Sequence, residues 1–125
     1  MITRLDHILL ATPPGGEERA RAFWGGLLGM QEEVKPGPLA DRGGCWFRTG
    51  VVIVHLGVEK GFVPQRKAHP AFCVPELDEL AHRLAKAGYP VEWDDTLPDR
   101  RRFYTADPFG NRIELLQDGQ GFGQK

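Results

Sequence analysis

Three histidines and one glutamate stand in short apolar segments that recur along the chain, at His7, His55, His69 and Glu114. Imidazole nitrogens and a carboxylate suit Fe, Mn, Ni, Co or Zn as a divalent ion. Three protein ligands on one side of such an ion leave positions open for a substrate or water. These residues therefore indicate a divalent metal site with His7, His69 and Glu114 as ligands and His55 as a related fourth group.

The segments that position these residues follow one order twice, which indicates an internal duplication. The helix-ending glycines Gly29 and Gly88 are separated by the same number of residues as His55 and Glu114. Two spans of apolar residues at helical spacing, 17–28 and 77–87, predict helices. Short apolar or alternating runs predict strands at 5–11, 31–35, 44–49, 51–57, 68–74, 91–93, 101–106 and 112–116. The predicted fold is α+β, a single domain over 1–125 with one βαβββ module at about 1–60, a second at about 67–117, and a tail at 118–125.

Side-chain alternation places the four groups on equivalent faces. In each predicted strand, the residues that must pack under a helix fall at the alternate positions. This turns His7, His55, His69 and Glu114 toward the face that the helix does not cover. A pseudo-two-fold axis that relates the modules would let these groups converge on one point.

The composition narrows the choice of partner and compartment. Lys and Arg together number 16 and Asp and Glu 17, so the net charge is -1. This balance argues against nucleic acid or an anionic membrane as partner, because both require clustered positive charge. No apolar run is long enough to span a bilayer. Cys45 and Cys73 form no disulfide framework or CxxC pair, so we expect a reduced, cytoplasmic protein.

Over about residues 4–117 the sequence resembles the vicinal oxygen chelate superfamily, which includes glyoxalase I, bleomycin-resistance proteins, fosfomycin-resistance transferases and extradiol dioxygenases. The resemblance is carried by the order and spacing of four segments: Leu5-Asp6-His7-Ile8, Phe23-Trp24-Gly25-Gly26-Leu27-Leu28-Gly29-Met30, His69-Pro70-Ala71-Phe72 and Asp107-Pro108-Phe109-Gly110-Asn111-Arg112-Ile113-Glu114-Leu115. It implies paired modules wrapped into a cupped mixed sheet around a central cavity. It also implies metal ligands at His7, His69 and Glu114, with His55 at the variable fourth-strand position.

The resemblance further implies a metal that acts as a Lewis acid on a small oxygen-chelating metabolite, in isomerase, lyase or transferase chemistry. Glyoxalase I carries a glutamate where this chain has His55, so we expect His55 to be a fourth ligand or a general base. Tyr104 matches a substrate-contacting tyrosine of the fosfomycin enzymes, and alternation puts Arg102 beside it. Trp46 and Phe47 lie on opposite faces of their strand, so one of them can line the cavity.

Two further expectations concern partners. Arg66-Lys67 and Arg100 to Arg102 suggest an anionic substrate. Small members of the superfamily often form dimers in which one chain gives the first-module ligands and the other the second-module ligands, so we expect a homodimer with a shared site. The alternatives are a protein that binds and sequesters a drug or metabolite, and an Fe(II) extradiol-type dioxygenase.

Overall fold

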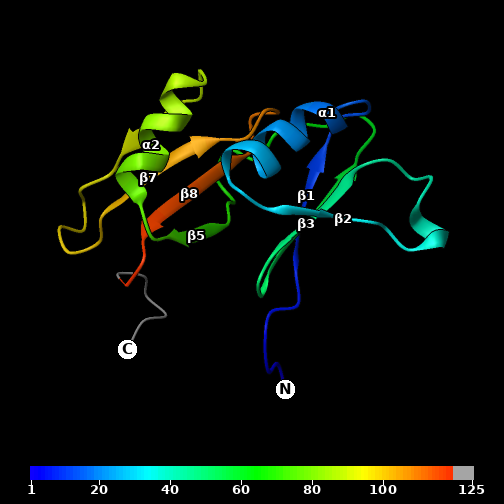
Figure 1. Cartoon of the computed structure of the whole chain (residues 1–125), viewed down its shortest axis with the longest axis horizontal. Helices are drawn as coiled ribbons and strands as arrows, with labels where there is room; N and C mark the ends of the chain where they lie inside the picture. Colours follow the sequence, from blue (N-terminus) through cyan, green and yellow to red (C-terminus); the bar gives the residue numbers. More distant parts are fainter. Residues whose placement is uncertain (120–125) are drawn as a thin grey trace. The chain divides into compact units, whose positions relative to one another are not determined.

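The elements of the chain follow the order βαβββ twice, in two compact units that run from Met1 to Pro64 and from Gln65 onward. A computed structural model describes residues 1–119 (Figure 1). Each unit contains one four-stranded mixed sheet and one helical segment against it. The structure therefore confirms the α+β class and the two predicted modules. Most of the predicted tail, residues 120–125, lies outside the described residues.

The first unit contains the strands β1 (Ile8–Thr12), β2 (Gln31–Glu33), β3 (Cys45–Thr49) and β4 (Val52–Val58). The sheet order is β1-β4-β3-β2, with β1 parallel to β4 and the other pairs antiparallel. A short 3-10 turn, η2 (Gly37–Leu39), interrupts the loop between β2 and β3. Val54 and Leu56 of β4 are buried and His55 between them is only half-buried, as the predicted alternation requires.

The first helix departs from the prediction of one α-helix over 17–28. Only α1 (Glu17–Ala20) is α-helical, and it continues as the π-helix η1 (Arg21–Leu27), in which Leu28 N donates to Phe23 O at 3.0 Å. Both Phe23 and Trp24 of this segment are fully buried in the core of the unit.

The second unit contains β5 (Ala71–Val74), α2 (Leu77–Lys86), β6 (Glu92–Trp93), β7 (Arg102–Ala106) and β8 (Arg112–Gln117). The sheet order is β5-β8-β7-β6, with β5 parallel to β8. α2 packs against β8 (Figure 1) and buries Leu77, Leu80 and Leu84. Asp118 N, just past β8, donates to Val74 O at 2.8 Å, so the first residue of the predicted tail is still attached to the sheet.

His7 and His69 lie just before β1 and β5 rather than within them, so these two strands are shorter than predicted. β1 begins at Ile8 rather than residue 5, and Leu5 is exposed. β5 begins at Ala71 rather than residue 68, because Pro70 has no backbone N–H to donate, although its carbonyl accepts from Glu114 N at 3.0 Å. Among residues 1–119 no helix is long and apolar enough to cross a membrane.

The turn between β7 and β8 is formed by residues whose types suit it. Gly110 N donates to Asp107 O at 3.1 Å, and Gly110 has a φ of 94°, which favours glycine. The Asp107 carboxylate is buried and accepts from Phe109 N and Asn111 N, both at 2.9 Å. Asn111 Oδ1 in turn accepts from Gln65 N at 3.0 Å, which ties the start of the unit to this turn.

Candidate functional site

The predicted site residues fall into two clusters, one in each unit. In the first unit, His55 lies between two other rings, because β4 runs between β1 and β3. Its ring stacks on Trp46 at a centroid distance of 3.8 Å and an angle of 4°, and on His7 at 4.2 Å and 28°. Trp46, rather than the fully buried Phe47, is therefore the aromatic residue on the open face of the sheet.

His7 is oriented by its neighbour. Its Nδ1 lies 2.9 Å from Asp6 Oδ2. A carboxylate can only accept a hydrogen bond, so Nδ1 is the donor here. Nε2 of the neutral ring then keeps its lone pair. The same contact lowers the pKa of the Asp6 carboxyl. This arrangement is the one in which a histidine presents Nε2 to a metal while a carboxylate holds the other nitrogen.

The surroundings of His55 favour its neutral form. Burial lowers the pKa of its imidazole, and the neighbouring His7 lowers it further. A neutral imidazole is the form that binds a metal or accepts a proton. Both roles expected for His55 therefore remain chemically available to it.

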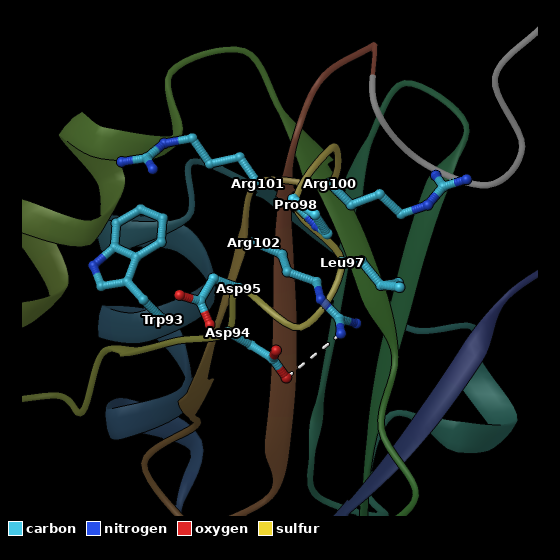
Figure 2. Close-up of a pocket in the computed structure, with 8 residues that line it drawn as sticks. All are labelled: Trp93, Asp94, Asp95, Leu97, Pro98, Arg100, Arg101 and Arg102. Atoms are coloured by element: carbon cyan, nitrogen blue, oxygen red, sulfur yellow. Dashed lines mark ion pairs between the residues drawn. The ribbon is translucent and has the colours of Figure 1, made fainter.

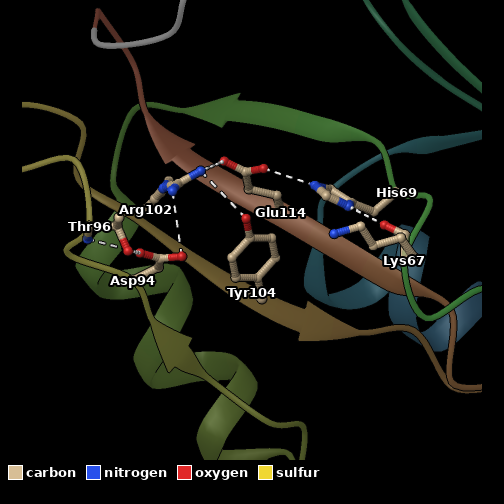
Figure 3. A network of polar contacts seen from close by, with 7 residues as sticks. All are labelled: Lys67, His69, Asp94, Thr96, Arg102, Tyr104 and Glu114. Atoms are coloured by element: carbon tan, nitrogen blue, oxygen red, sulfur yellow. Dashed lines mark hydrogen bonds and ion pairs between the residues drawn. The ribbon is translucent and has the colours of Figure 1, made fainter.

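In the second unit, His69 and Glu114 face each other, with His69 Nε2 at 3.0 Å from Glu114 Oε1 (Figure 3). His69 Nδ1 lies 2.8 Å from the Lys67 carbonyl oxygen, which can only accept, so Nδ1 carries a proton. In the neutral ring, Nε2 then directs a lone pair at a carboxylate oxygen. Such a pair requires a shared proton or cation, and it matches the donors that a divalent metal binds.

Arg102 contacts the other oxygen of the Glu114 carboxylate. Its Nη1 donates to Glu114 Oε2 at 3.1 Å and to Tyr104 Oη at 3.4 Å, and its Nη2 pairs with Asp94 at 3.4 Å (Figure 3). Burial by itself would lower the pKa of the guanidinium, but the Glu114 hydrogen bond and the nearby charges raise it. Arg102, predicted as a substrate contact, is thus already neutralised by two carboxylates.

Tyr104 lies on the same face, as alternation predicted. Its ring meets the His69 ring edge-on at a centroid distance of 5.3 Å. The Arg112 guanidinium lies 3.8 Å from the centroid of the Tyr104 ring. A cation over a tyrosine ring holds the ring in place, so the Tyr104 hydroxyl is presented from a fixed position beside Glu114.

The two pairs occupy equivalent positions in the strand registers. In the first unit, His7 stands two residues before Leu9, which is paired with His55. In the second unit, His69 stands two residues before Ala71, which is paired with Glu114. The antiparallel neighbours correspond as well, since Trp46 is paired with His55 and Tyr104 with Glu114. Neither unit, over residues 1–119, gathers three His, Cys, Asp or Glu side chains into one metal-binding group.

Each unit also has a hollow. In the first unit, a groove of about 700 Å³ opens beside His7, His55 and Trp46. In the second unit, a hollow of about 540 Å³ lies along the segment from Trp93 to Arg102 (Figure 2). There the Arg101 guanidinium lies 4.3 Å from the centroid of the Trp93 ring, and Arg102 is directed to Asp94. Of the candidate donors, His7 and His55 border the first of these hollows.

Comparison with known proteins agrees with this architecture. A family model of the glyoxalase-like domain matches residues 15–116. A Bacillus anthracis protein described as a glyoxalase family member is 50% identical over 94% of this chain and 96% of its own, with a TM-score of 0.89. No curated protein sequence matches the chain. The chain therefore belongs to the glyoxalase-like domain family of the vicinal oxygen chelate superfamily.

More distant structures share the fold. A glyoxalase/dioxygenase from Nostoc punctiforme is 24% identical, with a TM-score of 0.75 over 92% of this chain and 90% of that one. A variant of the fosfomycin resistance protein FosX from Listeria monocytogenes, complexed with Mn(II) and 1S,2S-dihydroxypropylphosphonic acid, is 20% identical. Its TM-score is 0.75, and the match covers 93% of this chain and 90% of that one.

Several residues of the two clusters were not found from the sequence. Asp6 holds His7, and its position directly before that histidine was the available signal. Asp94 pairs with Arg102 from a loop whose path no local pattern predicts. Lys35 and Arg42 line the groove of the first unit. Lys35 was placed in a strand predicted for 31–35, but β2 ends at Glu33, and no local pattern indicated the position of Arg42.

Proposed function

We propose that this chain is a divalent-metal-dependent enzyme of the glyoxalase-like family that acts on a small oxygen-chelating substrate. The main support is the His69–Glu114 pair, in which Nε2 and a carboxylate oxygen, both atoms that a divalent ion can bind, lie 3.0 Å apart. The register-equivalent pair His7 and His55 supplies further nitrogen donors. The Mn(II) named with the FosX structure supports the choice of a divalent ion.

We further propose that residues 1–125 form a single domain with one metal site. His7, His69 and Glu114 would be the ligands, in one chain or shared across a homodimer. His55 would be the fourth ligand or the general base.

When bound, the metal would supply Lewis-acid stabilisation of negative charge on a substrate oxygen. The protein groups would do the rest. Neutral His55 would accept a proton, and the stacked Trp46 would hold its ring in one plane. The Tyr104 hydroxyl would donate a hydrogen bond to the substrate. Arg102 would hold Glu114 through Oε2 and so leave Oε1 for the metal.

Metal analysis of protein purified without chelator tests the proposal. The wild type should contain a divalent metal, and Glu114→Gln should lose most of it. His82→Ala, which changes an exposed histidine of α2, should retain the wild-type content. A wild type that binds small molecules equally well with and without chelator, and contains no metal, would instead be a sequestering protein.

A further inference from the structure

Two permanent cations, Lys35 and Arg42, line the groove of the first unit. The imidazoles of His7 and His55 also line it, and Asp6 Oδ2 lies 2.9 Å from His7 Nδ1. No Asp or Glu is among the lining residues, although the chain as a whole has more acidic than basic residues. A concave site lined by one sign of charge raises the local concentration of ions of the opposite sign.

The two cations are held differently. Lys35 Nζ donates to the Gly43 carbonyl oxygen, which anchors the loop between β2 and β3 without neutralising the ammonium. The Arg42 side chain is exposed and has no ion pair or side-chain hydrogen bond in the part of the chain that the structure describes. It is thus a guanidinium with all its donors free for a ligand.

One carboxylate beside the loop is already engaged. Glu17 accepts from Gly44 N at 2.8 Å, and this hydrogen bond is the main reason why the pKa of Glu17 is lowered, with Arg21 and Lys35 adding weaker attractions. Glu17 therefore offsets part of the Lys35 charge.

Apolar side chains line the groove alongside the charged groups. Leu9, Leu39 and Val58 contribute to the lining, and Gly57 adds no side chain beside the histidines. Arg102, one of the cations that the sequence suggested for anion recognition, is paired with Glu114 and Asp94, whereas Arg42 in the first unit has no such partner within residues 1–119.

We infer that the groove binds an organic anion with an apolar body, whose carboxylate or comparable anionic group is recognised by Arg42 and Lys35. The inference rests on the proposed function, since it takes the groove beside His7 and His55 as the substrate site. It assigns the substrate class: a small molecule with chelating oxygens, an apolar middle and an anionic end.

The test uses the full chain freed of metal with a chelator. The probes are 3-phenylpropionate and its neutral amide, which differ in charge and hardly in shape. Binding is followed by NMR titration of the Trp46 indole N–H, whose resonance is assigned by its loss in Trp46→Phe. The carboxylate should bind at least about tenfold more tightly than the amide, because charge-assisted hydrogen bonds are roughly twice as strong as neutral ones.

The double variant Lys35→Gln with Arg42→Gln should lose this preference, while Arg42→Lys should keep most of it. Lys60→Gln, an exposed lysine of the same unit outside the groove, should behave like the wild type. Equal binding of carboxylate and amide by the wild type, or an unchanged preference in the double variant, overturns the inference.

Metal content, measured on the same proteins before chelation, separates this inference from the proposed function. A metal-free wild type that still prefers the carboxylate supports the anion site and contradicts the metal enzyme. A metal-containing wild type without the preference supports the metal enzyme and overturns the anion site.

Discussion

Replacing Arg102 by methionine removes the guanidinium that neutralises two carboxylates and keeps a side chain that can fill much of its space. The Arg102 side chain is 13% exposed and that of Glu114 is 9% exposed, so the pair is largely shielded from water. Removal of one partner from a buried ion pair costs about 3–5 kcal/mol. Glu114 keeps His69 as a partner, and Asp94 is more exposed, so we expect a cost at or just below the lower end of this range, about 2–3 kcal/mol.

The measurement is urea unfolding in the presence of a chelator, followed by circular dichroism. A double-mutant cycle with Glu114→Gln isolates the pair, because the double variant no longer buries an unpaired carboxylate at this position. The coupling free energy should be at least about 1 kcal/mol. Arg101→Met is the matched control: Arg101 pairs with Asp78 on the surface, and its loss should cost less than about 1 kcal/mol. An Arg102→Met variant as stable as this control, or a coupling near zero, would refute the reasoning.

Three further predictions concern the scaffold. Gly44→Ala should destabilise the protein by about 3 kcal/mol or more in thermal unfolding, because Gly44 has a φ of 80° and a Cβ would stand 2.0 Å from a strand carbonyl oxygen. Gly29→Ala, with a φ of 75° and open space around it, should cost only about 1–2 kcal/mol, and equal losses would contradict the steric argument. Because the pKa of Glu17 is lowered in the folded protein, its contribution to stability is full above the ordinary value of 4.5 and is lost as the pH falls through the lower folded-state pKa. Glu17→Gln should therefore reduce the fall of the unfolding free energy at acidic pH. An unchanged fall would count against this prediction. Burial raises the pKa of the Cys45 thiol to about 11, so a thiol reagent at neutral pH should modify only the exposed Cys73 of the native protein, and reaction of both thiols before denaturation would disprove this.

Much of the fold could be predicted from the sequence because the deciding signals are local. Alternation correctly placed His55 and Glu114 opposite the helix-covered residues, and the turn at Asp107 and Gly110 formed as its residue types require. The π-helix was not foreseen, because the apolar spacing around Phe23 and Trp24 fits an α-helix equally well.

The partners of the site residues were harder to predict, because they come from loops and from other strands. Side-chain alternation along the strand could not decide whether Trp46 or Phe47 faces the groove. The structure shows that Trp46 stacks on His55 and that Phe47 is fully buried. Arg102 was expected to meet a substrate, and its pairing with Asp94 depends on the path of the chain between β6 and β7. The free guanidinium of Arg42 likewise becomes visible only once its loop is placed.

The central claim is that His7, His69 and Glu114 bind one divalent ion. Metal stoichiometry of the wild type, His7→Ala and His69→Ala, each purified without chelator and checked for folding by circular dichroism, tests it most directly. We expect about one bound ion per chain in the wild type and loss of the ion in either variant, because three ligands are needed for a stable site. A metal-free wild type, or full metal content in one of the two folded variants, would contradict it.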